Sequence, residues 1–303
     1  MVTVRLSPFR SPRHLVALFL GALCLARFPA LAQQEPERPL PEIRAFLDEV
    51  RQRLHSDDYL LDQYTFSERR VERRFDAKGH VKGEKHEVYE VYPSARTRLT
   101  YRKLVERNGR ALSAEKLAEQ DREHEKKVDR ATRKGDAAEA RRRDRMAERE
   151  RREQEIVDEL FRVYDIQIDG RETIEGRSAV LVTFRPRAGV KPSTRPGKIL
   201  QKFSGRAWVD EEDYQVVRAE AELLDTFSYG LGVIARLYKG ATASFQRRKV
   251  NGELWLPSEA RFRGRARLLL VKGLRIDSLS EYSDYKKFQV ATETAITPDK
   301  TAE

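Results

Sequence analysis

The sequence predicts an α+β fold built on a predominantly antiparallel sheet of about ten strands, with two principal helices. Runs in which apolar and polar residues alternate recur between residues 64 and 110 and between residues 161 and 290, as in strands that bury one face. Turn-forming residues separate successive runs, as between the strands of hairpins. Strands do not alternate with helices, which argues against a doubly wound parallel sheet.

Residues 1–32 have the three parts of a secretory signal peptide. Three arginines and no acid occupy the first 14 residues, residues 15–26 are apolar, and Ala30-Leu31-Ala32 offers small residues for cleavage. The apolar run is shorter than the roughly 20 residues that a membrane-spanning helix needs. We therefore expect cleavage after Ala32 and soluble export, with residues 33–290 forming one domain and residues 291–303 a flexible tail.

Charge and cysteine content narrow the class of protein. Cys24 is the only cysteine, so the mature chain has none, which excludes disulfide frameworks, thiol nucleophiles and cysteine-ligated zinc. The leader carries four of the 60 basic residues and none of the 49 acidic ones, which leaves a mature net charge of +7. Export argues against a nucleic-acid partner.

The first half of the mature chain predicts one helix and three strands. Apolar residues recur at helical spacing from residue 41 to residue 56, which indicates an amphipathic helix. After this helix the pattern changes to stretches typical of β-strands, separated by clusters of turn-forming residues. The strands are expected at residues 65–75, 84–92 and 96–107, with turns at residues 77–80 and Asn108-Gly109.

Residues 115–155 account for the high share of charged residues. Of these 41 residues, 14 are basic and 13 acidic, and only three are large and apolar. Pairs such as Glu148/Arg152 at i,i+4 favour helix, with a weak point at Gly135. Because no heptad pattern is sustained, we expect a solvated, partly frayed helical arm, inserted at residues 113–160 between the third and fourth strands.

The second half predicts seven more strands. Asn251-Gly252 is a favoured type I′ turn pair and predicts one hairpin, and the acidic turn at residues 211–213 predicts another. The strands are expected at residues 161–168, 179–186, 202–210, 214–224, 242–250, 253–261 and 268–285, the last broken by Lys272-Gly273.

No local motif predicts catalysis, a metal or a cofactor. The histidines are scattered, and the glycines at residues 230–232 lack the strand–turn–helix context of a dinucleotide site, so we interpret them as a bend. The glycines at residues 189 and 197 are too far apart for a phosphate loop. No nucleophile elbow is present either. The sequence therefore predicts a protein that is not an enzyme.

Two basic features remain. Eight bases and no acid lie between residues 176 and 209, and arginines alternate with apolar residues from 261 to 268. Each of the two features has two interpretations. It is either a solvated strand surface without a ligand, or a surface that attracts an anionic lipid headgroup, a membrane surface or an acidic partner. Three prolines predict a long loop at residues 185–198, able to act as a gate. Its anion-binding candidates are Arg185, Arg187, Lys191, Arg195 and Lys198.

Three motifs in the second half resemble those of a known family. They are Trp208-Val209-Asp210 ending a strand, Val216-Val217-Arg218-Ala219-Glu220 on a return strand, and Trp255-Leu256-Pro257 on a later one. They resemble the LolA/LolB-like superfamily of periplasmic lipoprotein-sorting carriers and their uncharacterised relatives, clearly over residues 160–290 and by pattern over residues 41–110. The charged segment departs from the carriers' pattern. The resemblance implies a curved, unclosed antiparallel half-barrel whose concave side holds acyl chains.

Two hypotheses for the function follow. The first is a periplasmic, non-enzymatic protein that shields a lipid or lipoprotein acyl chain in an apolar concavity, without a cofactor. The alternative is an envelope sensor or scaffold whose interior is filled and whose charged arm, residues 115–155, contacts a protein partner. Aromatic residues with the period of the strands are the candidates for lining a cavity: Tyr89, Tyr101, Trp208, Phe227, Tyr229 and Trp255.

Overall fold

The computed structural model describes residues 38–54, 61, 63–76, 78–93, 100–133, 135–229, 235–268 and 274–287. The chain divides into two compact units, Met1–Pro39 and Leu40–Glu303, and the described helices and strands belong to the second. The expected signal peptide, the glycine bend at residues 230–234 and the tail lie outside the described residues. No helix in the described ranges combines the length and the apolar character needed to cross a membrane.

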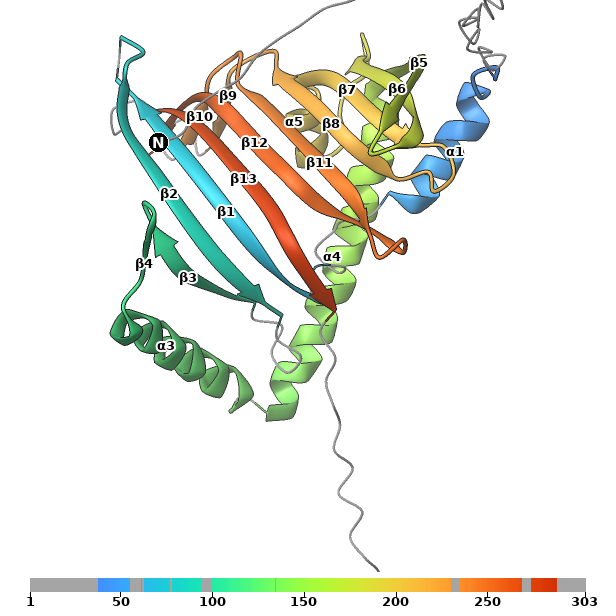
Figure 1. Ribbon diagram of the computed structural model, residues 1–303. Coiled ribbons are helices and arrows are strands. Elements are labelled where there is room, and N and C mark those ends of the chain that lie inside the picture. Colours follow the sequence, from blue (N-terminus) through green and yellow to red (C-terminus); the bar gives the residue numbers. More distant parts are fainter. Residues whose placement is uncertain are drawn as a thin grey trace, which may run out of the picture. The chain divides into compact units, whose positions relative to one another are not determined.

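Thirteen strands form one antiparallel sheet, coloured from cyan to red along the chain in Figure 1. They are β1 (Tyr64–Phe75), β2 (Val81–Tyr92), β3 (Tyr101–Arg107), β4 (Arg110–Ala111), β5 (Tyr164–Ile174), β6 (Arg177–Pro186), β7 (Phe203–Asp210), β8 (Val216–Leu223), β9 (Phe227–Tyr229), β10 (Ala235–Leu237), β11 (Thr242–Val250), β12 (Leu254–Leu268) and β13 (Leu274–Lys287). Their order in the sheet is β4-β3-β2-β1-β13-β12-β11-β8-β7-β6-β5, and β10 pairs with β12 and β9. In the described part of the chain the sheet is unclosed, with β4 and β5 at its ends.

Four helices accompany the sheet in the described residues: α1 (Ile43–Arg53), α3 (Ala114–Thr132), α4 (Gly135–Val163) and α5 (Arg195–Leu200). The side chain of Glu42 caps α1 by accepting hydrogen bonds from two backbone N–H groups of its first turn. The charged insertion is two helices rather than one, and the second begins at Gly135, where the sequence predicts the weak point. Its Glu148–Arg152 ion pair is present as expected.

The strand count is higher than the expected ten. The three additional strands, β4, β9 and β10, have only two or three residues each, and they are defined by pairing with a neighbour rather than by alternation of apolar and polar residues. The run predicted from residue 268 to residue 285 corresponds to β13, except that Leu268 is the last residue of β12, and residues 161–163 belong to α4 rather than to a strand. The helical insertion consequently follows the fourth strand and not the third.

The Asn-Gly turns have the backbone conformation that the sequence predicts. Asn251 and Gly252 have φ angles of 54° and 69°, and Asn108 and Gly109 have φ angles of 51° and 74°. Two consecutive positive φ angles define the type I′ turn, whose twist matches that of a hairpin. These turns set the register of β11 against β12 and of β3 against β4.

The main apolar core lies between α1 and one end of the sheet. Phe46 and Val50 of α1 pack against Val180 and Val182 of β6 and Val209 of β7. All five side chains are less than a tenth exposed, and burial of this apolar surface is the main term that holds α1 on the sheet. We call the side of the sheet that α1 covers the α1 face.

Cross-strand register extends the α1 face across the whole sheet. Directly opposed residues of neighbouring strands point to the same side. Starting beneath α1, successive partners on this face are Val182, Ala207, Ala219, Phe245, Ala260, Ser280, Arg70 and Glu87. The face therefore passes from a bulky apolar residue at β6, through small residues and Phe245, to charged residues at β1 and β2.

Helix α3 is attached to the edge of the sheet rather than projecting as a free arm. The side-chain amide of Gln120 accepts a hydrogen bond from the Leu104 N–H at 3.0 Å and donates one to the Leu104 carbonyl oxygen at 3.0 Å. Asp121 accepts hydrogen bonds from Tyr101 and Lys103, and the ring of His124 stacks on that of Tyr101. The amide of Gln120 thus takes the place of a further strand beside β3.

Candidate functional site

A hollow of about 650 Å³ opens on the α1 face over the centre of the sheet. We call it the central hollow. Its volume is within the range of roughly 300–1,000 Å³ found for small-molecule sites. It is lined by Glu68, Arg70, Arg102, Ala219, Ala221, Ala243, Ser244, Phe245, Ala260, Arg261, Phe262, Ser278, Ser280 and Tyr282.

The central hollow exists because the residues of its floor are small. Ala221 faces Ala243 across β8 and β11, and Ala260 faces Ser280 across β12 and β13. Beneath α1, the equivalent positions of the same face carry valines that fill the space against Phe46. A row of methyl and hydroxymethyl groups leaves the volume that larger side chains would occupy.

The two ends of the central hollow differ chemically. Phe245 and Phe262 contribute apolar surface above the alanines. At the β1 end, Glu68 accepts hydrogen bonds from the Arg102 Nε at 2.7 Å and from the Ser280 hydroxyl at 3.2 Å. The site is therefore amphipathic, with an apolar floor and a charged end.

The charged end is firmly built. The guanidinium of Arg102 lies 3.5 Å from the centre of the Tyr89 ring, a cation–π contact. Burial alone would lower the pKa of Arg102, but the hydrogen bond and the charge of Glu68 outweigh it and raise the pKa. Burial has the opposite effect on a phenol: it raises the pKa of Tyr282, so this side chain is neutral at physiological pH. The Glu68–Arg102 pair therefore forms a fixed wall rather than a mobile surface.

Trp208 and Trp255 do not line the central hollow. They are 2% and 4% exposed and belong to a second buried cluster. The Nε1 of Trp208 donates to Glu172 at 2.8 Å and that of Trp255 to Asp213 at 2.7 Å. Both rings are held in the protein interior, and their indole N–H groups are satisfied by carboxylates.

The remaining aromatic candidates are dispersed. Tyr89 lies beneath Arg102, just behind the charged end, and donates its hydroxyl to Glu87 at 2.8 Å. Tyr101 contacts α3, and its hydroxyl donates to Asp121. Phe227 is half-buried in β9, and the side chain of Tyr229 is outside the described set. Of the five candidates whose side chains the structure describes, none lines the central hollow, and only Tyr89 lies next to it.

The basic segment at residues 185–198 is not one long loop. Its first two residues belong to β6 and its last four to α5, and the connection between them is anchored by hydrogen bonds. Arg185 is the last residue but one of β6, and Arg195 and Lys198 lie in α5. The side chain of Arg187 donates to the Tyr164 carbonyl oxygen at 2.8 Å. Lys191 is exposed. None of the five rim candidates lines the central hollow; the cations that do are Arg70, Arg102 and Arg261.

A buried carboxylate fixes this segment to α4. Glu159 is 3% exposed and accepts hydrogen bonds from the backbone N–H and the hydroxyl of Ser193, at 2.9 and 2.8 Å. The ion pair with Arg162 and the bonds from Ser193 lower the pKa of Glu159 to about 2 against the opposing effect of burial. Gly197 is adjacent, and a Cβ there would lie 2.1 Å from the carboxylate.

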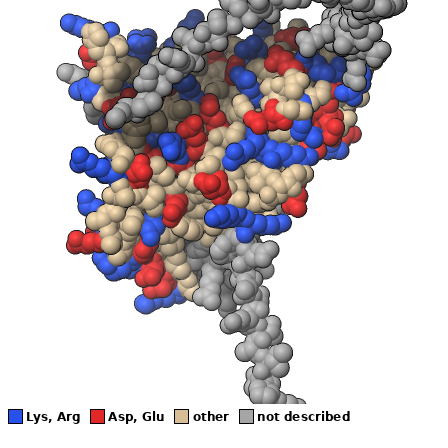
Figure 2. Space-filling view, viewed as in Figure 1, with Lys and Arg blue, Asp and Glu red and all other residues tan. Residues whose placement is uncertain are grey.

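The alternating arginines of β12 are neutralised in part. Arg261 and Arg263 both donate to Asp277 on the neighbouring strand, at 3.0–3.2 Å. As the sequence predicts, these arginines alternate with Phe262 along β12, so their side chains leave the strand on the side opposite to that of Phe262. Phe262 lines the central hollow, and Arg261 also borders it. Figure 2 shows basic and acidic side chains interspersed over the side of the molecule in view.

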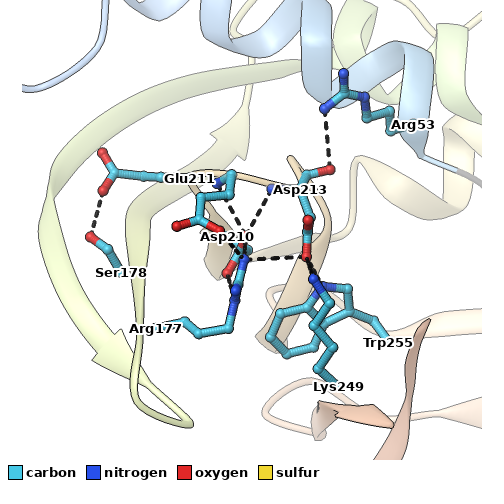
Figure 3. Close-up of polar contacts among 9 residues, drawn as sticks. Arg53, Arg177, Ser178, Asp210, Glu211, Asp213, Lys249 and Trp255 are labelled. Atoms are coloured by element: carbon cyan, nitrogen blue, oxygen red, sulfur yellow. Dashed lines mark hydrogen bonds and ion pairs between the residues drawn. The ribbon is translucent and has the colours of Figure 1, made fainter. Parts of the chain in front are cut away.

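The motifs that resemble the LolA-like superfamily build a structural network (Figure 3). Asp210, 1% exposed, accepts two hydrogen bonds from Arg177 at 2.7 and 2.8 Å and others from backbone N–H groups of its own turn. Asp213 accepts from Lys249 and from Trp255, both at 2.7 Å. Burial opposes the ionised form of Asp213, and these two bonds outweigh it and lower the pKa.

This network joins separate parts of the fold. The backbone oxygen of Asp213 accepts a hydrogen bond from Arg53 at the end of α1, and Gln215 donates to the Arg53 carbonyl oxygen. The turn between β7 and β8 therefore holds both α1 and the β11–β12 hairpin. The motif residues Trp208, Asp210 and Trp255 are buried and hydrogen-bonded within the fold, and none of them lines the central hollow.

The sequence reasoning missed the residues that make the central hollow. In the sequence, the hollow is marked by pairs of small residues two positions apart, as in Ala219-x-Ala221 and Ser278-x-Ser280. In a strand, such residues share a face. Their value as a signal depends on the strand order, which places both pairs in one row. In the described residues no three His, Cys, Asp or Glu side chains are grouped to hold a metal ion.

Comparison with known proteins finds distant structural likeness only. No family model and no curated protein matches the chain. A LolA superfamily protein from Nitrosomonas europaea aligns with 14% identity over 83% of this chain and 96% of its own, with a TM-score of 0.29. A putative outer membrane lipoprotein-sorting protein domain from Vibrio parahaemolyticus aligns with 9% identity over 82% and 93%, with a TM-score of 0.28.

A third solved structure is the MucA/MucB complex of Pseudomonas aeruginosa, which aligns with 12% identity over 79% of this chain and 93% of its own, with a TM-score of 0.20. The aligned structures include members of the superfamily that the motifs resemble.

Proposed function

We propose that this protein is an exported, non-enzymatic binding protein that shields the acyl chain of a lipid or lipoprotein in the central hollow. The observation that carries the proposal is the hollow itself: a floor of alanines, phenylalanines at one side and a charged end on the same face. An apolar chain laid over Ala221 and Ala243 would remove apolar surface from water, and the polar end of the ligand would meet the charged wall.

Two further features support this proposal. The leader at residues 1–32 has the composition of a signal peptide, which would place the protein where lipoproteins are sorted. The titratable groups at the charged end of the hollow, Glu68 and Arg102, are held in an ion pair at 2.7 Å. This arrangement suits binding better than acid–base chemistry.

The alternative function is an envelope sensor or scaffold. Helix α3 favours it, because none of the residues of this 19-residue helix is buried and much of its charged surface is available to a protein partner. In that case the central hollow would be a packing defect. The two functions differ in whether the purified protein carries an amphiphile.

Native mass spectrometry of the periplasmic protein, followed by lipid extraction, tests the proposal. We expect a bound amphiphile that a fluorescent acyl probe displaces. The variant Ala243→Trp should abolish probe binding, because an indole would fill the hollow between β8 and β12.

The matched control is Thr242→Trp, one position along β11. Thr242 is exposed on the opposite face, so probe binding should remain unchanged. A ligand-free protein, together with equal probe binding by the two variants, would exclude the carrier and leave the scaffold.

A further inference from the structure

The three arginines that line the central hollow are not equivalent. Arg102 is neutralised by Glu68 at 2.7 Å, and Arg261 by Asp277 at 3.0 Å. Arg70 has only one ion pair in the described residues, a contact of 3.5 Å between its Nη2 and Glu72. Its charge is the least compensated of the three.

The carboxylates around Arg70 are bound more closely by other cations. Glu72 pairs with Arg74 at 2.7 Å. Glu87, the cross-strand partner of Arg70, pairs with Lys85 at 2.7 Å and with Arg107 at 3.1 Å. With the Glu68–Arg102 pair included, the ion pairs around Arg70 join three carboxylates to five cations, so this cluster has a net charge of +2.

Arg70 also has a donor without a partner. Its Nε is buried and makes no hydrogen bond to any described residue. A guanidinium presents its Nε and Nη donors as a planar fork that matches the two oxygens of a carboxylate or phosphate. A buried, unsatisfied donor beside an open hollow indicates where such a group binds.

We infer that Arg70 is the specificity-determining residue of the central hollow and that the bound amphiphile carries an anionic oxygen group, a carboxylate or a phosphate. This inference rests on the proposed function and adds to it the chemistry of the polar end of the ligand. It also moves the anion site from the basic segment at residues 185–198 to β1. Arg102 supports the site as a wall, since Glu68 and Tyr89 hold its guanidinium in place.

Three amphiphiles of equal chain length test the inference by displacement of a fluorescent acyl probe: dodecanol, dodecanoate and dodecyl phosphate. We expect at least one of the two anions to bind about tenfold or more tightly than dodecanol. The anion that binds more tightly identifies the source as a fatty acid or as a phosphate-bearing lipid. The preference should shrink with added salt, as for a partly exposed charge.

The variant Arg70→Gln should lose the preference for anions while binding dodecanol as tightly as the unchanged protein. Arg70→Lys should keep part of it, because the charge remains and the fork is lost. The matched control is Arg69→Gln, because Arg69 is exposed on the opposite face of the same strand and its loss should have no effect.

The possible failures are distinguishable. If dodecanol and the anions bind the unchanged protein equally, or if Arg70→Gln retains the preference with an unaltered free energy of unfolding, the inference is wrong and the proposed function stands. If no amphiphile binds at all, the proposed function fails and the inference with it.

Discussion

One face of a single sheet is closed at β5–β7 and open at β8–β13. At the closed end, Val180, Val182 and Val209 pack against Phe46 of α1 and are buried. At the open centre, alanines and serines occupy the same kind of strand position and leave the central hollow. The strands are paired antiparallel in both regions.

The difference shows that side-chain volume decides whether this face holds a core or a site. In both regions, every second residue of a strand points to this face, so the alternation of residues along the strands does not distinguish the two regions. What distinguishes them is whether a branched residue or an alanine stands at each position. Substitutions that change side-chain volume or anchoring should therefore have different effects in the two regions.

The largest effect is expected from Phe46→Ala at the closed end. Removing a buried phenylalanine costs about 3–5 kcal/mol of the free energy of unfolding, through lost transfer energy and the cavity left beside Val182 and Tyr214. Urea unfolding measures it. A cost below about 1 kcal/mol would show that α1 is not part of the core.

Glu159→Gln should give the next largest effect, because it weakens the anchor of α5 at the closed end. Loss of hydrogen bonds to a charged group costs roughly 1.5–3 kcal/mol at neutral pH. The pKa of Glu159 is lowered to about 2 from 4.5. Its contribution is therefore complete above pH 4.5 and lost as the pH falls from there towards 2.

The cost of Glu159→Gln should accordingly be large at pH 7 and small near pH 2.5, as measured by urea unfolding at both values. Glu155→Gln is the control, since Glu155 is exposed on the same helix and should show little cost at either pH. Equal costs of Glu159→Gln at the two pH values would exclude an ionised anchor.

Much of the fold could be predicted from local signals. The spacing of Phe46 and Val50 defines α1, and the Asn-Gly pairs define two turns, because each depends on residues near in sequence. The strands β4, β9 and β10 could not be predicted, since they are too short for alternation and exist only through pairing with neighbours. The docking of α3 was missed for the same reason: Gln120 meets Leu104 only in the folded sheet.

The site was less predictable than the fold. Large aromatic residues such as Trp208 and Trp255 attracted attention as lining candidates, but their size fills space and places them in the buried cluster. The open volume comes from residues that are unremarkable alone, such as Ala221 and Ala243. They make a row only through strand order, which follows from long-range pairing.

A smaller effect is expected from Gln120→Ala at the edge near the open region. The Leu104 N–H and carbonyl oxygen each lose a hydrogen bond worth roughly 0.5–1.5 kcal/mol, so the free energy of unfolding should fall by at most about 1–3 kcal/mol, less where water replaces the lost bond. Hydrogen exchange at the Leu104 amide should also become faster. Glu119→Ala, exposed on the same helix, is the control; if it speeds exchange equally, the edge contact is unspecific.

The smallest effect on stability is expected from Ala221→Leu in the central hollow. In a close-packed core, three added carbon atoms would force side chains apart and typically cost 1–3 kcal/mol. Ala221 borders open space instead, facing Ala243 across the pair of strands, so the free energy of unfolding should change by no more than about 0.5 kcal/mol. Probe binding should nevertheless weaken, because the leucine takes up volume that the ligand needs. A variant destabilised by more than 1 kcal/mol would mean that the centre of the face is packed like its end. The comparison between the two regions would then fail, since volume alone would no longer separate site from core.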